Sequence, residues 1–167
     1  YTDYTYNSST ASPLTQTYND GKTSYTTAYE YTSMGLVSKI TDPMGFTTNY
    51  LYDKIGNVTS ESFTGGDIST TKSYVYDYTG NTMTYTNENG NKIKYSYDPA
   101  GNLTTVVDIE NSSNTLESYE YDMYMRLKKQ TEGNAVTELT YDNRDRVTRS
   151  VTKNTGGTKL AQTDYAY

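Results

Sequence analysis

Carboxylates are the side chains of this sequence best suited to chemistry, because paired Asp or Glu residues can act as general acids and bases or bind metal ions. Histidine and cysteine are absent from the 167 residues, which excludes nucleophilic triads and thiolate metal sites. The acidic residues recur roughly every 20 residues in turn-like contexts, which is typical of turn capping and not of a single catalytic dyad. The sequence therefore predicts that the chain is not an enzyme and has no catalytic residue, cofactor or metal site.

Two short stretches resemble fragments of ligand-binding loops. Gly21-Lys22-Thr23 matches the end of a phosphate-binding loop, but Gln16 stands where the first glycine of that loop belongs and no helix is expected to follow. Asn87-Glu88-Asn89-Gly90 resembles part of a calcium loop, yet Tyr85 occupies the first ligand position and Ser96 the twelfth. Neither stretch supports a nucleotide or calcium site.

A recurring motif, Tyr-x-Tyr-Asp-x-x-Gly-Asn followed by Leu or Val, organises the sequence. Its second tyrosines fall 20 to 26 residues apart. Some copies are incomplete: Thr32 replaces the aspartate in one, and Met125 and Arg126 replace the Gly-Asn pair in another. The residues that we expect to build this structural motif are Tyr29, Tyr31, Gly35, Tyr50, Tyr52, Asp53, Gly56, Asn57, Tyr74, Tyr76, Asp77, Gly80, Asn81, Tyr95, Tyr97, Asp98, Gly101, Asn102, Tyr119, Tyr121, Asp122, Tyr141 and Asp142.

Each copy of the motif predicts a β-hairpin. Tyr-x-Tyr alternates with a period of two, so both rings leave the same face of a strand. Asp-x-x-Gly is typical of a type I turn in which the aspartate caps backbone N–H groups and the glycine takes the left-handed conformation. A second set of turns, such as Asp42-Pro43-Met44-Gly45, Asn89-Gly90 and the stretch Asp108 to Asn114, falls between the motifs. We therefore predict an all-β fold, a continuous antiparallel β-hairpin repeat strip of roughly fourteen short strands.

No linker-like change in composition interrupts the repeats. We therefore expect residues 1–167 to form a single array of about seven hairpin repeats without an internal domain boundary. Because partial copies of the motif stand at both ends of the sequence, we expect it to be a fragment of a longer protein.

The composition fits a thin sheet better than a thick core. Hydrophobic residues make up 33% of the chain, below the roughly 45–50% of an average domain. With 21 Tyr, two Phe and no Trp, tyrosine must supply most of the aromatic burial, and each buried hydroxyl needs a partner. The net charge of −6 argues against nucleic acid and anionic membranes as partners. No apolar run approaches the roughly 18 residues of a membrane span.

Two basic clusters stand in the C-terminal third of the sequence. We interpret them as charges that blunt an exposed face or an edge of the strip. A docking patch for an acidic partner is the alternative interpretation. The clusters are Arg126, Lys128 and Lys129, and Arg144, Arg146 and Arg149.

The motif resembles the YD repeat, named for its Tyr-Asp pair, of bacterial Rhs and wall-associated proteins. Similar repeats occur in the B and C components of insecticidal toxin complexes and in teneurins. The resemblance covers Tyr29 to Val147 and, more weakly, the two ends. In that family, successive hairpins join edge to edge into a strip that spirals into a hollow shell, often around a polymorphic C-terminal toxin.

The resemblance implies a structural segment of a secreted or cell-surface bacterial protein. Such a segment would form part of a β-shell (or stalk) that encapsulates or displays a C-terminal toxin or effector. Its partners would be the neighbouring repeats of the same chain and the enclosed toxin domain. The resemblance also implies that the second tyrosines, Tyr52, Tyr76, Tyr97, Tyr121 and Tyr141, line a stacked face of the strip.

Regularly spaced aromatic hairpins also occur in repeats that bind choline or glucans, where the rings stack on a quaternary ammonium group or a sugar face. A carbohydrate- or cell-wall-binding module, with cell-wall glycan as its partner, is therefore the alternative function. Such repeats usually use Trp as well as Tyr, and Trp is absent here. We therefore interpret the tyrosines mainly as packing residues, and the sequence identifies no particular ligand-binding residue.

Overall fold

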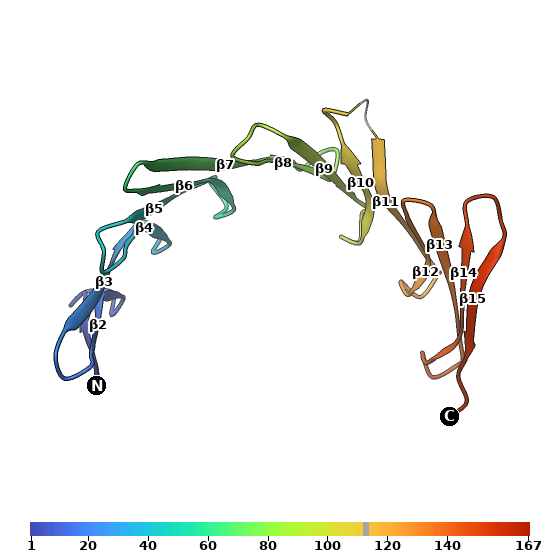
Figure 1. Cartoon of the computed structure of the whole chain (residues 1–167), viewed down its shortest axis with the longest axis horizontal. Coiled ribbons are helices and arrows are strands. Elements are labelled where there is room, and N and C mark those ends of the chain that lie inside the picture. Colours follow the sequence, from blue (N-terminus) through green and yellow to red (C-terminus); the bar gives the residue numbers. More distant parts are fainter. Residues whose placement is uncertain (112–113) are drawn as a thin grey trace. The chain divides into compact units, whose positions relative to one another are not determined.

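A computed structural model describes residues 1–111 and 114–167 of the chain. These residues form strands and turns, and no helix is present among them (Figure 1). Within each of the two compact units of the chain, hydrogen-bonded neighbours in the sheet follow the order of the sequence. The predicted all-β antiparallel hairpin strip is confirmed, with fifteen strands in the described residues instead of roughly fourteen.

The strands are five to ten residues long. They are rich in Thr, Tyr and Val, whose branched or planar side chains fit a pleated surface. Their bounds are β1 Thr2–Tyr6, β2 Pro13–Asn19, β3 Ser24–Tyr31, β4 Val37–Thr41, β5 Thr47–Tyr52, β6 Val58–Gly65, β7 Ile68–Asp77, β8 Thr82–Thr86, β9 Lys92–Tyr97, β10 Leu103–Asp108, β11 Asn114–Tyr121, β12 Leu127–Glu132, β13 Ala135–Tyr141, β14 Val147–Asn154 and β15 Lys159–Asp164.

The chain divides into two compact units. Unit 1 comprises residues 1–75 and 86–90, and unit 2 comprises residues 76–85 and 91–167. In unit 1 the strands β1 to β7 pair antiparallel in succession. In unit 2 the strands β9 to β15 do the same. Each unit is thus a meander in which a hairpin contacts the hairpins before and after it.

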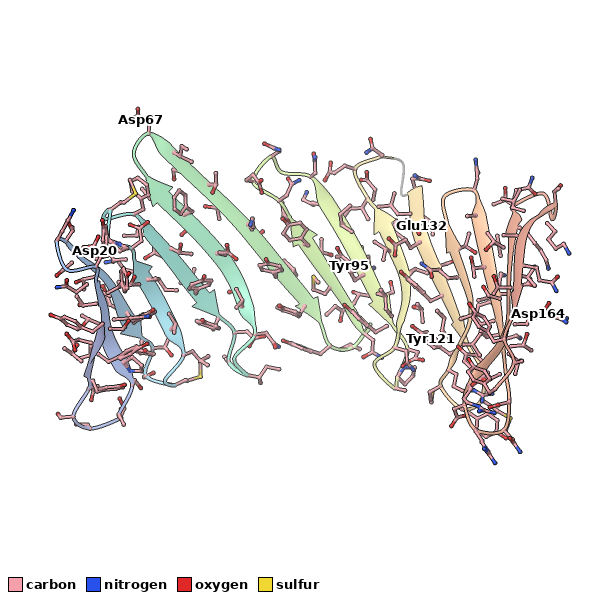
Figure 2. All side chains as sticks on the ribbon, turned by 60° about the horizontal axis from the view of Figure 1, so that its bottom comes forward. Asp20, Asp67, Tyr95, Tyr121, Glu132 and Asp164 are labelled. Carbon is pink, nitrogen blue, oxygen red and sulfur yellow. The ribbon has the colours of Figure 1, made fainter. Side chains whose placement is uncertain are left out.

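The turns of each meander alternate between two edges. In unit 2, Tyr121 at the end of β11 and Glu132 at the end of β12 lie at opposite edges (Figure 2). The turns that follow the second tyrosines therefore share one edge of each unit, which we call the motif edge. The interleaved turns share the other edge. In the interleaved turn from Asp108 to Asn114, residues 112 and 113 lie outside the described residues.

The sheet buries little apolar surface. Val106, 6% exposed, is the only buried apolar side chain among the described residues. In the Tyr-x-Tyr segments between Tyr29 and Tyr121 the two rings are half-buried, whereas the residue between them points to the other face. Leu51 and Val75, which hold this middle position, are each 64% exposed. Stability must therefore come from ladder hydrogen bonds and from side chains that lie across neighbouring strands.

One small aromatic cluster covers the end of β6 in unit 1. The rings of Phe46 and Phe63 meet edge to face, with centroids 6.1 Å apart. A Cβ atom at Gly65 would lie 2.6 Å from Cγ of Phe46. Only glycine at this position allows the ring to approach the backbone so closely.

Candidate functional site

The turn after each second tyrosine is organised by its aspartate. Oδ1 of Asp98 accepts hydrogen bonds of 2.9 Å from the backbone N–H groups of Ala100 and Asn102. The N–H of Gly101 donates to the Asp98 carbonyl over 3.0 Å and closes the turn. Asp53, Asp122 and Asp142 accept the same two side-chain bonds, and the hydroxyl of Thr32 replaces the carboxylate in the first complete hairpin repeat.

The side chain four residues after the aspartate completes the turn. Nδ2 of Asn102 donates to Oδ2 of Asp98 over 2.9 Å, and Asn57 donates to Asp53 over 3.3 Å. The bonds from the Asn102 side chain and backbone hold the pKa of the Asp98 carboxyl below its ordinary value, because they stabilise its charged form. Each such turn is therefore tied both through its backbone and through a side-chain pair.

Arginine replaces this asparagine in two later copies. Nε of Arg126 donates to Asp122, and Nε of Arg146 donates to Asp142, both over 2.8 Å. The hydrogen bond from Arg146 lowers the pKa of the Asp142 carboxyl. Of the two basic clusters, Arg126 is engaged within its own turn: its side chain is only 21% exposed and is paired with Asp122.

The fourth residue of each motif turn is left-handed. Gly35, Gly56 and Gly101 have φ values of 78°, 94° and 88°, as the motif predicts. Met125 and Asp145 hold the same place with φ values of 63° and 61°, although a Cβ atom makes this conformation less favourable. The hairpin geometry is thus kept where the glycine of the motif is lost.

The turn from Asp77 to Asn81 is built differently. β7 continues through Asp77, so four residues separate it from β8. Oδ1 of Asp77 accepts bonds from the N–H groups of Thr79 and Gly80 over 3.0 and 2.9 Å. The left-handed residue is Asn81, with a φ of 49°. The prediction that Gly80 takes this conformation is therefore wrong, because the last residue of the shorter connection takes it instead.

A β-bulge follows the motif turn. Tyr52 pairs with Val58 while Leu51 pairs with Ser60, so Thr59 faces no partner on β5. A bulge bends its strand and increases the local twist. The same shift in register occurs beside Tyr31, Tyr97, Tyr121 and Tyr141.

The hydroxyl of the second tyrosine reaches the hairpin that precedes it. Tyr141 donates to the carbonyl of Leu127 over 2.6 Å, and Leu127 is the residue that pairs with Tyr121. Tyr121 in turn donates to the carbonyl of Leu103 over 2.9 Å. We call each of these bonds a tyrosine staple. Further staples join Tyr31 to Pro13 (2.7 Å), Tyr52 to Val37 (2.6 Å) and Tyr167 to Val147 (3.0 Å).

Each staple satisfies a carbonyl that lies beyond the end of a strand ladder. Pairing of β12 with β13 begins at Lys129, two residues after Leu127. The Leu127 carbonyl therefore lies outside the β12–β13 ladder and needs another donor. Tyr141 supplies it. Burial raises the pKa of the Tyr141 hydroxyl further above neutral pH.

Arginine adds a second connection between neighbouring motif turns. The Arg126 guanidinium lies 4.5 Å from the centre of the Tyr141 ring, and Nη1 donates to Asp145 over 2.7 Å. The Arg146 guanidinium lies 4.3 Å from the centre of the Tyr167 ring. Both arginines therefore pair with the aspartate of their own turn and stack on the second tyrosine of the next repeat.

The first tyrosines of the motif are also half-buried. Burial is the main cause of the raised pKa of the Tyr50 and Tyr95 hydroxyls. The Tyr119 hydroxyl donates to the carboxylate of Glu117, and this bond raises the pKa of Tyr119 to about 12. Tyr29 and Tyr74, the other first tyrosines, are half-buried as well, and so are the second tyrosines Tyr76 and Tyr97.

The described residues offer no further obvious chemistry. No group of three or more acidic side chains in residues 1–111 and 114–167 is arranged to hold a metal ion. The described part of the chain also contains no helix that is long and apolar enough to cross a membrane.

The meander, the capped turns and the staples together define a β-hairpin repeat strip. Residues 76–113 match the RHS repeat family. The resemblance to the YD/Rhs repeat family that the motif indicates is confirmed by this match. A comparison with curated proteins gives no significant match.

The solved structures are chains of toxin complexes. This chain is similar to a chain in the Photorhabdus luminescens Tc holotoxin pore with a TccC3 variant. The similarity covers 99% of this chain, with a TM-score of 0.78 and 20% sequence identity. It is also similar to TcdB2-TccC3 without its hypervariable C-terminal region, with a TM-score of 0.71 and 19% identity over 86% of this chain. The chain spans only 10% and 9% of the lengths of these two chains. The likeness therefore shows a shared fold.

Proposed function

We propose that this chain is a wall segment of a secreted or cell-surface bacterial protein of the toxin-complex type. Its hairpin repeats would form part of a β-shell or stalk that encapsulates or displays a C-terminal toxin or effector. The series of tyrosine staples carries this proposal, because it directs the most regular polar groups of the repeat toward the neighbouring repeat and away from a ligand. The shared fold with chains of the Tc holotoxin and TcdB2-TccC3 supports it.

A single-layered wall has a particular physical need, since it has no thick core to hold its hairpins together. Staples and arginine links at the motif edge meet this need one neighbour at a time. Such an array can be extended by adding repeats, so residues 1–167 would be about seven units of a longer strip. The role requires no catalytic residue, cofactor or metal ion, in keeping with a protein that is not an enzyme.

The proposal is tested in the full-length protein by measuring how fast a protease cleaves the region downstream of the repeats. Replacing Tyr52, Tyr121 and Tyr141 together with Phe should speed this cleavage, because loss of the staples loosens the wall. A control with Phe at Tyr4, Tyr18 and Tyr165 keeps every staple and should behave like the parent. Cleavage at the same high rate in the parent and in both variants would contradict enclosure.

One feature of unit 1 favours the alternative function, binding of carbohydrate or cell-wall glycan. The rings of Tyr4 and Tyr6 stack 6.2 Å apart, and those of Tyr18 and Tyr25 stack 6.3 Å apart. All four side chains are 44 to 55% exposed, and exposed ring faces are surfaces on which sugars stack. Saturable retention on purified cell wall that disappears in a fully stable Tyr18→Ala variant would support this alternative. No retention of the parent chain would exclude it.

A further inference from the structure

A recess opens at the motif edge of unit 2, between the turn Asp77–Asn81 and the turn Asp98–Asn102. Its volume is about 320 Å³, and Tyr76, Tyr78, Tyr97 and the two turn aspartates line it. The rings of Tyr76 and Tyr78 are stacked with centroids 6.0 Å apart and planes inclined by 10°. Aromatic faces beside carboxylates form a favourable environment for a cation.

The recess lies where the regular staple is missing. Among the described residues, the Tyr97 hydroxyl has no carbonyl partner of the kind that Tyr121 and Tyr141 have. The backbone N–H of Tyr97 donates instead to the carbonyl of Asn81 over 2.9 Å. The shorter turn that ends in left-handed Asn81 therefore leaves Tyr97 beside an open recess.

At two other places in unit 2, which we call arginine joints, an arginine of one motif turn covers the second tyrosine of the next repeat. Arg126 stacks on Tyr141 at 4.5 Å, and Arg146 stacks on Tyr167 at 4.3 Å. Each arginine stands four residues after the aspartate of its turn and donates to that carboxylate over 2.8 Å. At the recess this sequence position is Asn81, whose side chain is short, uncharged and exposed.

The acceptor for a guanidinium is present at the recess. Oδ1 of Asp77 accepts two backbone N–H groups of its own turn, and Oδ2 has no hydrogen-bond partner among the described residues. In the turns of Asp122 and Asp142, Oδ2 is the atom that the arginine contacts. Asp98, a second carboxylate, stands on the other side of the recess. The recess thus has the ring and the carboxylate of the arginine joints without their arginine.

We propose that this recess binds the arginine side chain of a separate basic peptide segment, which stacks on Tyr97 and donates to Oδ2 of Asp77. Arginine suits the recess better than lysine, because its planar guanidinium stacks on rings and pairs with carboxylates in a fixed geometry. The net charge of −6 also favours a basic partner over an acidic one. This docking point is an addition to the structural role, because a wall segment needs no such site.

The test is titration of the 167-residue chain with the capped peptide Gly-Arg-Gly, followed by the NMR signals of the tyrosine rings. We expect saturable shifts of the Tyr97 signals, and affinity weaker by roughly tenfold for Gly-Lys-Gly. Asn81→Arg should place a guanidinium in the recess from within the chain and abolish binding. Asn134→Arg, at the opposite edge, should leave binding unchanged.

Controls separate this site from the wall function. Tyr141→Phe removes a staple but should leave peptide binding intact, whereas Tyr97→Leu should abolish it. A peptide with citrulline, which keeps the shape but lacks the charge, should not bind. Binding of citrulline equal to that of arginine, full binding by Asn81→Arg, absence of saturation, or preference of the recess for a glycan over the arginine peptide would each overturn the proposal.

Discussion

The hydroxyl of Tyr141 donates a 2.6 Å hydrogen bond to the backbone carbonyl of Leu127, the first residue of the return strand in the preceding repeat. That carbonyl lies beyond the end of the β12–β13 ladder. One tyrosine therefore supplies the inter-repeat hydrogen bond that the backbone does not make at this point. Tyr121 and Leu103 have the same relationship, so the bond recurs in neighbouring repeats.

Replacing Tyr141 with Phe should destabilise the chain by about 1 kcal/mol, because it removes one hydrogen bond and keeps the ring. Chemical denaturation measures the loss. Tyr165→Phe is the matched control, because Tyr165 is 47% exposed and lacks a staple, and it should unfold like the parent. Equal stability of all three proteins would show that the staple is energetically unimportant.

Replacing Gly101 with Val should cost about 1–2 kcal/mol or more, because a β-branched residue is strained at positive φ. Gly101 has a φ of 88°. Ala100→Val changes the neighbouring turn residue without requiring positive φ and should cost much less. Thermal unfolding of the two variants decides the matter, and a neutral Gly101→Val would mean that the turn is assigned wrongly.

Acid should weaken the motif turns. The pKa of Asp98 is lowered by the hydrogen bonds from Asn102, and that of Asp142 by the bonds from Arg146. A carboxyl whose pKa is lower in the folded state stabilises the fold above its unfolded pKa of about 3.9, and this stability is lost as the pH falls through the folded value. We therefore expect the melting temperature to fall below about pH 4. Asp142→Asn should make this fall shallower, and an unchanged acid profile in that variant would contradict the assignment.

Arg126→Gln should lower the melting temperature more than Arg144→Gln. Arg126 bonds to Asp122 and Asp145 and stacks on Tyr141, whereas the side chain of Arg144 makes no such contact among the described residues. Added salt should reduce the difference between the two variants, because part of it is electrostatic. A salt-independent difference would indicate that the aliphatic part of Arg126 matters more than its charge.

The sequence was sufficient to predict the strands and turns, because Tyr-x-Tyr and Asp-x-x-Gly are local signals. Val37, Val58 and Leu103 begin their return strands where the motif places them. Gly80 is not left-handed, because the turn between β7 and β8 is one residue shorter than the other motif turns. The motif residues are the same there, but β7 extends through Asp77 and the left-handed position falls on Asn81.

The staples and the arginine links could not be predicted from the motif. The staples occur next to β-bulges, and the bulged positions beside Tyr31, Tyr52, Tyr97, Tyr121 and Tyr141 hold Ser, Thr or Lys, which give only a weak signal in the sequence. The role of Arg126 depends on the positions of Tyr141 and Asp145 in the next repeat. Such a contact between repeats follows from strand register, which short motifs do not encode.

The central claim is that the second tyrosines hold neighbouring repeats together and do not serve a ligand. Unfolding and glycan retention of Tyr121→Ala, measured on the same preparation, test it most directly. We expect a loss of about 3 kcal/mol, the usual scale for deleting a packed aromatic ring, and no saturable retention by the parent chain. A fully stable Tyr121→Ala variant that loses a saturable glycan binding of the parent would contradict the claim.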